Sequence, residues 1–255
     1  AKSHGVKKTI AGVENIDYFP TYQYSDNRYT GAAAVIINRF AQLNDHSITY
    51  SAFPLTRLNT YFLNGTIDFR FPDNPLWLQK PKTGYDIHYS SAVIDFIDGV
   101  MVKPKNLSKG KTSLKQLGIV RGFTPWDYLG DIKAGNILLN ETNSILSLLK
   151  LTSLERYDGA YLNIDIARHH QTNAQDSSEQ LVFDPELPYT QSSYSLSSYK
   201  YPNVIEQFNQ FLIEQKDWVK TVKEKYKMRW STQLPQVLKT PWQWLVQCIL
   251  MAISE

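Results

Sequence analysis

Residues 117–129, LGIVRGFTPWDYL, carry the pattern around which the rest of the chain is organised. The apolar residues 118–120 predict the end of a buried strand, and the RGF that follows predicts a tight turn. Thr124 followed by Pro125 is typical of the start of a helix, because proline at the first helical position removes no hydrogen bond that the helix needs. The segment therefore predicts a strand, a turn and a helix that Thr124 caps.

The start of this predicted helix is a candidate site for an anion. The first N–H groups of a helix have no partner within it, and the helix dipole adds positive charge there. Arg121 stands just before them, and its guanidinium has the forked geometry that suits a carboxylate. Arg121 and Thr124 are therefore candidate ligand-binding residues. The alternative is an ordinary strand-to-helix turn in which Thr124 only caps the helix.

The composition describes a globular chain without a bias toward nucleic acid. Hydrophobic residues make up 42% of the 255 residues and charged residues 20%, which is enough apolar surface for one large domain or two ordinary ones. The net charge is +3 and no block of Lys and Arg interrupts the sequence, so we expect no nucleic-acid partner. One cysteine, Cys248, excludes an internal disulfide and a metal site built on cysteine. No apolar run reaches the length that a membrane span needs.

Strand and helix patterns alternate twice along the chain, which predicts two α/β units with parallel strands and helical crossovers. Apolar residues recur at helical spacing in some segments and alternate as in strands in others. In the first unit these segments are residues 9–13, 32–43, 48–53, 55–63 and 67–71; in the second they are residues 118–120, 126–129, 136–139, 143–150 and 157–163.

The strand-like segments between the two units predict a hinge. A chain that leaves one lobe, builds another and returns crosses twice, and ligands bind in the gap between such lobes. We expect lobe 1 to comprise residues 1–97 and 193–228, lobe 2 to comprise residues 98–192, and the crossings to lie near 97–102 and 186–193. Residues 229–255 are expected to form a C-terminal helical extension.

Five short motifs occur in the order typical of one known family. They are the aromatic loop 18–24 with a Gly-led helix at Gly31, LNGTID at 63–68, YSSA at 89–92, the segment 114–124, and DGA at 158–160. In this order they resemble the extracytoplasmic solute-binding proteins of family 3, the polar amino acid type. The resemblance covers roughly residues 9–228.

The resemblance implies a two-lobed type II periplasmic-binding-protein fold, in which two βα domains are joined by a two-strand hinge with the ligand cleft between them. It implies a monomeric periplasmic protein, with any signal peptide removed, that binds a small polar or amino-acid-like ligand and delivers it to the permease of an ABC transporter. It implies no cofactor, no metal and no catalytic activity. Two alternatives stay open: a dehydratase on the same fold, and a ligand-sensing input module of a signalling protein.

Two departures from the family pattern concern the ligand. The family Arg that binds the ligand carboxylate would lie within residues 72–86, where the cations are Lys80 and Lys82. The family Asp that holds the ammonium is replaced by Asn163. The chain therefore lacks the family's arginine at one end of the ligand site and the family's aspartate at the other. For this reason the sequence favours a small organic acid, a modified amino acid or a ring-bearing ligand over a standard amino acid.

The candidate ligand-binding residues are aromatic, amide or charged side chains near the predicted cleft. For several of them a structural role is the alternative: surface packing for Tyr22, a solvated charge for Arg57, and a turn for Asp73. A catalytic role for His169 and His170 is not expected, because adjacent residues on a helix face different ways. The full set is Tyr18, Tyr22, Arg57, Arg70, Asp73, Trp77, Arg121, Thr124, Tyr161 and Asn163.

Overall fold

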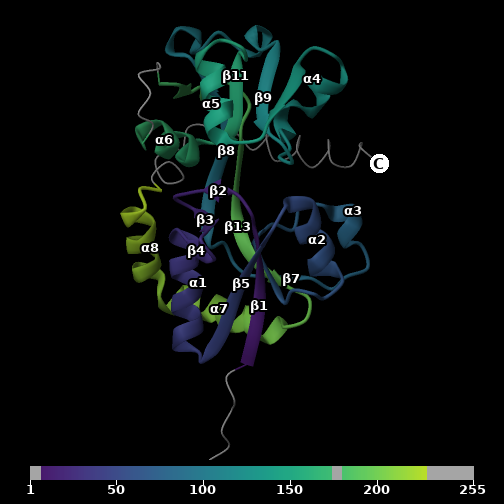
Figure 1. Cartoon of the computed structure of the whole chain (residues 1–255), viewed down its shortest axis with the longest axis vertical. Coiled ribbons are helices and arrows are strands. Elements are labelled where there is room, and N and C mark those ends of the chain that lie inside the picture. The colour runs from purple at the N-terminus through teal and green to yellow at the C-terminus, as the bar shows by residue number, and fades with distance from the viewer. Residues whose placement is uncertain (1–6, 174–179, 229–255) are drawn as a thin grey trace, which may run out of the picture.

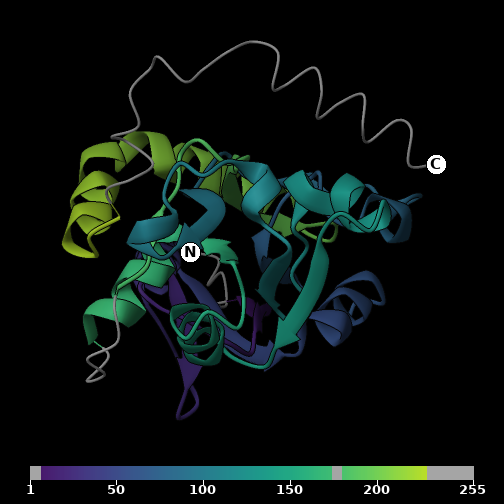
Figure 2. The ribbon, with the colours of Figure 1, turned by 90° about the horizontal axis from the view of Figure 1, so that it is seen from above.

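The computed structural model describes residues 7–173 and 180–228 of the chain, so the predicted extension at 229–255 lies outside the described residues. Within this part the chain forms a two-lobed mixed α/β fold, with one lobe above the other in Figure 1. In the view from above, the second lobe lies in front of the first (Figure 2). One sheet path runs through both lobes, in the order β10-β9-β11-β8-β13-β6-β1-β5.

The first lobe is built on three parallel strands, with β1 paired to β5 on one side and to β6 on the other. Gly12 of β1 permits close packing against the neighbouring elements, because a Cβ there would lie 2.1 Å from the Ile67 side chain. Figure 1 shows α1 and α2 on opposite sides of these strands. The bounds are β1 Lys7–Glu14, β5 His46–Phe53, β6 Phe69–Asp73, α1 Ala32–Leu43 and α2 Leu55–Leu63.

Smaller elements complete the first lobe. The aromatic segment at 18–24, predicted as a loop, contributes to a three-stranded antiparallel sheet that places Tyr18 and Tyr22 opposite each other. The chain returns from the second lobe to form α7 and α8 against the first. These elements are β2 Asp17–Tyr18, β3 Tyr22–Ser25, β4 Arg28–Thr30, α3 Gln79–Lys82, β7 His88–Tyr89, α7 Pro202–Glu214 and α8 Lys216–Lys225.

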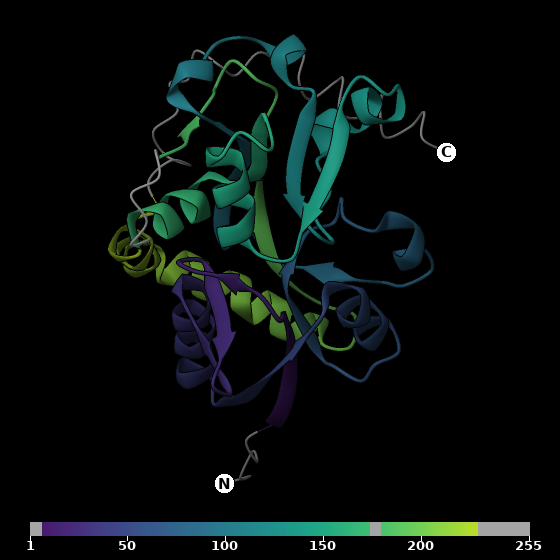
Figure 3. The same cartoon turned by 45° about the horizontal axis from the view of Figure 1, so that its top comes forward.

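The second lobe repeats the α/β arrangement. β9 pairs in parallel with β10 and β11, and Figure 1 shows α5 and α4 on either side of β9. Figure 3 shows β9 and β10 ending where the two lobes meet. The elements are η1 Pro104–Asn106, η2 Lys111–Ser113, β9 Gln116–Val120, η3 Trp126–Tyr128, α4 Leu129–Lys133, β10 Leu138–Thr142, α5 Ile145–Ser153, β11 Gly159–Asn163, α6 Ile164–Asn173 and β12 Val182–Phe183.

Two long antiparallel strands, β8 (Ile94–Val102) and β13 (Thr190–Ser198), run between the lobes. β8 pairs with β13 over residues 94–98 and with β11 over residues 98–101, while β13 continues to pair with β6 of the first lobe. The sheets of both lobes are therefore joined through these two strands. The lobe boundaries given from the sequence stay predictions.

The helix expected after Phe123 differs from the prediction. Residues 126–128 form a single 3₁₀ turn, followed by the five-residue helix α4, and Pro125 rather than Thr124 stands at the cap position of the turn. The Thr124 side chain makes no capping hydrogen bond; its backbone carbonyl accepts a hydrogen bond from the N–H of Trp126 at 3.0 Å. So short an element has a weak dipole and few aligned N–H groups, so the structure does not support the anion site predicted at this helix start.

Candidate functional site

A cavity of about 380 Å³ lies between the two lobes and touches both crossing strands. Its volume falls within the range of small-molecule binding sites. Aromatic side chains from both lobes and from the crossing strands contribute to its walls. Its lining residues include Glu14, Tyr18, Tyr22, Asn59, Arg70, Asn74 and Trp77 from lobe 1, Phe96, Asp98, Thr190, Ser192 and Tyr194 from the crossing strands, and Phe123, Thr124 and Trp126 from lobe 2.

Stacked aromatic rings connect the lobes at one side of the cavity. Tyr18 of β2 stacks on Tyr22 with ring centroids 5.2 Å apart, and on Phe123 of the second lobe at 5.6 Å. On the crossing strands, Phe96 stacks on Tyr194 at 4.3 Å. Such rings offer flat apolar faces to a ligand, and their negatively polarised faces also attract cations.

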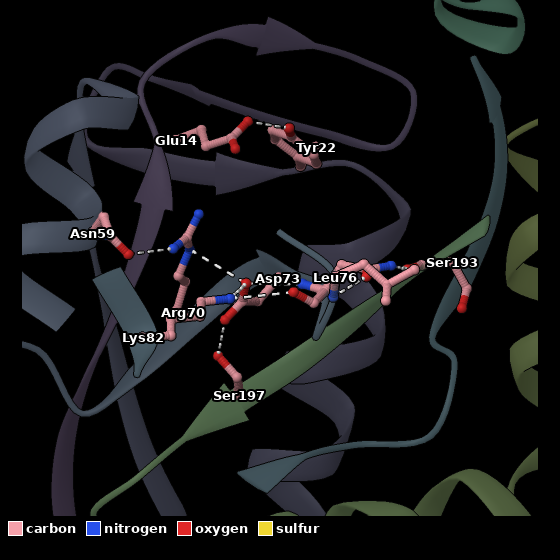
Figure 4. Close-up of polar contacts among 10 residues, drawn as sticks. Glu14, Tyr22, Asn59, Arg70, Asp73, Leu76, Lys82, Ser193 and Ser197 are labelled. Atoms are coloured by element: carbon pink, nitrogen blue, oxygen red, sulfur yellow. Dashed lines mark hydrogen bonds and ion pairs between the residues drawn. The ribbon is translucent and has the colours of Figure 1, made fainter. Parts of the chain in front are cut away.

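The first-lobe wall holds a buried acid paired with a tyrosine. The hydroxyl of Tyr22 donates a short hydrogen bond to the carboxyl of Glu14, and Figure 4 shows the two side chains facing each other. Burial raises the pKa of Glu14, while the Tyr22 hydrogen bond and the charge of Arg70 lower it. The net shift is upward, which disfavours the ionised form of Glu14.

Arg70, the second residue of β6, borders the cavity at the same wall. Its Nη1 donates a hydrogen bond to Oδ1 of Asn59 at 3.2 Å, and its Nε lies 3.9 Å from Oδ1 of Asp73. The side chain borders the cavity but is almost completely covered, with 1% of its surface exposed. Figure 4 shows its second terminal nitrogen pointing toward the side where Glu14 and Tyr22 lie. Arg70 therefore gives this wall a positive charge without offering an open face.

Asp73 serves the structure of the first lobe and does not line the cavity. It forms an ion pair with Lys82 at 2.6 Å and accepts a hydrogen bond from the hydroxyl of Ser197 at 2.6 Å (Figure 4). Burial lowers the pKa of Lys82, and Asp73 opposes that shift. Since Lys82 is the closer cation, Asp73 is compensated mainly by Lys82, and the charge of Arg70 is left partly uncompensated.

Asn74 ties the loop after β6 to crossing strand β13. Its amide nitrogen donates to Oγ of Ser192 and to the carbonyl of Ser193, both at 3.0 Å, and its Oδ1 accepts from the N–H of Leu76 at 2.8 Å. Because these bonds fix the Asn74 side chain, this part of the wall is held in place before any ligand enters.

Two carboxyl groups lie at the second-lobe side of the cavity. Oδ2 of Asp127 accepts hydrogen bonds from Thr190 at 2.7 Å and from Tyr161 at 3.1 Å. Oδ1 of Asp98 is buried and has no hydrogen-bond partner among the described residues. Burial, and then the charge of Asp127, raise the pKa of Asp98 to about 7. Of these two neighbouring acids, Asp127 therefore accepts two hydrogen bonds, whereas Oδ1 of Asp98 accepts none from the described residues.

The structure brings half of the predicted site residues together at the cavity and separates the rest. Tyr161 borders a small adjoining cavity of about 20 Å³, which Asp98 and Tyr18 also line. Arg57 and Arg121 are exposed and line neither cavity, and Arg121 is paired with Glu141 at 3.3 Å. The predicted residues at the main cavity are Tyr18, Tyr22, Arg70, Trp77 and Thr124.

Asn163 is used inside the second lobe. Its Oδ1 accepts hydrogen bonds from the N–H groups of Asp165 at 2.9 Å and Ile166 at 3.3 Å, at the start of α6. Its amide nitrogen donates to the hydroxyl of Tyr194 at 3.5 Å. The side chain is therefore committed to a helix start and to a cavity-wall tyrosine, and neither described cavity includes it.

The sequence prediction missed several residues that the structure places at the cavity, above all Glu14, Asp98 and Tyr194. For Asp98 a signal was present, because it stands in the strand sequence IDFIDGVMV, whose side chains are apolar apart from Asp95 and Asp98. A charge within a buried strand needs a partner. The described residues hold no group of three or more potential metal ligands, and none of their helices is both long and apolar enough to cross a membrane.

No protein-family model and no curated protein matches the chain, but solved structures resemble it. The substrate-binding protein of an amino acid ABC transporter has a TM-score of 0.67 at 16% identity, over 86% of this chain and 99% of its own. A periplasmic binding protein of an arginine transport system from Legionella pneumophila has 0.67 at 13%, over 87% and 100%. An ancestral amino-acid-binding protein, a precursor of cyclohexadienyl dehydratase, has 0.66 at 14%, over 86% and 95%.

The chain has the fold of the periplasmic solute-binding proteins. The resemblance seen in the sequence is thereby confirmed at the level of the fold, as is the two-lobed architecture with its α/β lobes. In this binding-protein fold the cavity occupies the gap between the lobes, where the carboxyl ends of β1 and β9 meet the crossing strands.

Proposed function

We propose that the chain is a solute-binding protein that encloses a small polar or amino-acid-like ligand between its lobes. The observation that carries this proposal is the cavity itself, which both lobes and both crossing strands line. A ligand there contacts both lobes at once, so its binding favours the closed arrangement over the open one. The aromatic walls suit a ligand with an apolar or ring-shaped body.

The charges around the cavity suit a ligand that is also polar. Arg70 gives the first-lobe wall a positive charge, and Asp98 places a carboxyl group at the opposite side. Asn74 and Ser192 add fixed polar groups between them. A few placed polar groups in an otherwise aromatic wall are typical of sites that orient a small molecule.

Delivery to an ABC transporter is part of the proposal. It is supported by the fold, which is shared with the substrate-binding protein of an amino acid ABC transporter. It carries with it a location outside the cytoplasm and a permease as partner, and we expect a monomer. Co-purification with a permease from the same membrane, increased by added ligand, would support this part.

Ligand binding can be tested with a variant whose new side chain fills the cavity. Thr124 borders it and its side chain has no capping role, so Thr124→Phe places a ring in the ligand space. Thr112, an exposed residue of the same lobe, provides the matched control Thr112→Phe. Binding is measured by calorimetry with whichever compounds stabilise the unaltered protein in a thermal-shift screen of amino acids, organic acids and amines.

We expect Thr124→Phe to weaken binding about tenfold or more, and Thr112→Phe to leave it unchanged, with both variants folded by circular dichroism. Unchanged affinity in Thr124→Phe would place the ligand elsewhere. No stabilisation by any compound, together with native mass spectra of the purified protein free of bound ligand, would contradict the binding function. Loss of water from an added compound during incubation would instead identify a dehydratase.

A further inference from the structure

We propose that Asp98, on crossing strand β8, binds a protonated amine of the ligand, so that the ligand carries an ammonium group at the second-lobe side of the cavity. This inference rests on the proposed binding function and names the chemistry of one end of the ligand. It assigns the cation site to the strand between the lobes, and not to position 163, where the chain has a neutral asparagine.

The position of Asp98 in the sheet places its side chain on the face that borders the cavity. Asp98 lies opposite Thr190 of β13 and opposite Asn163 of β11, at the rung where β8 changes partner. Side chains of directly opposed residues project from the same face of a sheet. Since Asp98 and Thr190 both line the cavity, this face is the cavity side. Asp98 also borders the small adjoining cavity.

The carboxyl group of Asp98 has neither a cation nor a hydrogen-bond donor as a partner for Oδ1 among the described residues. Oδ1 of Asp98 is buried, accepts no hydrogen bond from the described residues, and Asp98 forms no ion pair with any described cation. The ionisable groups that face it are Tyr18 of β2, Tyr161 of β11, Tyr194 of β13 and Asp127 of η3. None of these groups is cationic.

Two of the hydroxyl donors near Asp98 are used by another group, because Thr190 and Tyr161 both donate to Asp127. The Tyr194 hydroxyl accepts from the amide of Asn163, and no described hydrogen bond joins it to Asp98. An isolated buried carboxylate is strongly unfavourable unless it is protonated or paired. The described residues provide hydrogen bonds to Asp127 and none to Oδ1 of Asp98, although Asp98 lines the cavity.

The group that would satisfy Asp98 has to come from the ligand and has to be a hydrogen-bond donor. A protonated amine supplies N–H donors and a positive charge, the two things that Asp98 lacks. The stacked rings of Phe96 and Tyr194 lie beside it on the same sheet face and favour a cation over an anion. A ligand carboxylate at this end would instead lie beside the two acids Asp98 and Asp127, and like charge would disfavour it.

The test compares matched compounds with the same apolar body that carry both an ammonium and a carboxylate group, the ammonium alone or the carboxylate alone. The probes are L-phenylalanine, 2-phenylethylamine and 3-phenylpropanoate, and the corresponding set L-leucine, isoamylamine and 4-methylpentanoate. Thermal shift and calorimetry are run on the full chain, on Asp98→Asn, and on Asp95→Asn, which changes an exposed acid of the same strand.

In the unaltered protein we expect at least one set in which the compounds with an ammonium group bind about tenfold or more tightly than the acid. Asp98→Asn should remove that preference, and Asp95→Asn should keep it. If the acids bind as tightly as the amines, or if Asp98→Asn keeps the preference, the amine site is refuted while the binding function stands. If none of the six compounds binds, the inference fails, and the cavity-filling variants decide the binding function separately.

A second measurement covers the case in which Asp98→Asn does not fold. Because the pKa of Asp98 is raised to about 7, the unaltered protein should bind the amines about tenfold more tightly near pH 8 than near pH 6. Asp127, Tyr18, Tyr161 and Tyr194 face Asp98, and burial raises the pKa of each of them as well. Amine binding that does not change between these pH values would overturn the assignment.

Discussion

The unpaired carboxyl of Asp98 makes a prediction about the protein without any ligand. Burial and the charge of Asp127 raise its pKa from 3.8 to about 7, so the folded state holds this proton more tightly than the unfolded chain does. By linkage, stability falls as pH rises between the two values and reaches its low level above the folded pKa. Asp98→Asn removes the titrating group, and we therefore expect it to stabilise the ligand-free protein at alkaline pH.

The magnitude follows from the shift. A shift of about three pKa units corresponds to about 4 kcal/mol, and we take half of this, about 2 kcal/mol, because the side chain keeps some contact with solvent. For a chain of this size that is a rise in Tm of roughly 4–8 °C. The gain should shrink by more than half near pH 5, where folded Asp98 is protonated.

The assay is urea unfolding and calorimetry near pH 5 and near pH 8.5. Asp95→Asn is the control, since an exposed acid on the same strand should change stability by less than about 0.5 kcal/mol. A destabilised Asp98→Asn at alkaline pH would show that Asp98 already has a partner in the protein, and a gain of the same size at both pH values would show that its pKa is not raised. The reasoning for the amine site would then fail as well.

Two further predictions concern residues that the sequence assigned to the ligand. Asp73→Ala should destabilise the fold by about 3–5 kcal/mol in urea, because it leaves Lys82 buried without its counter-charge, whereas the exposed Asp86→Ala should have little effect; similar unfolding midpoints would contradict the buried ion pair. Arg121→Ala should leave ligand affinity within about twofold, because its side chain is exposed and paired with Glu141 at the surface. A tenfold loss by calorimetry would restore Arg121 to the site.

The elements that the sequence predicted best are those whose pattern is local. The two helices at 32–43 and 55–63 have the bounds that helical spacing and the Asn-Gly stop indicated. The α/β alternation and the two crossings also follow from short apolar runs and the polar segments between them. The prediction of a helix capped by Thr124 was wrong. The Thr-Pro pair is a common cap pattern, but here it precedes only a 3₁₀ turn.

The types of residue at the candidate site could be predicted from the sequence. The ion pairs and hydrogen bonds that each residue makes could not. Tyr18, Tyr22 and Trp77 were assigned to the cleft from their aromatic character and their place after strands, and the structure puts all three at the cavity. Asp73 looked equally suitable from the sequence, since it also follows a strand. Its pairing with Lys82 and Ser197 removes it from the ligand space.

By itself the sequence determined the helices at 32–43 and 55–63, the repeated α/β alternation and the aromatic character of the cleft, because each depends on residues close together in the chain. The tertiary structure alone decided which charges are compensated. Thr190 is 63 residues from Asp127, and Ser197 is 124 residues from Asp73, so no local pattern shows that these acids are satisfied and that Asp98 is not. Compensation of a buried charge is a property of neighbours in space, and it is what separates structural acids from the one left facing the cavity.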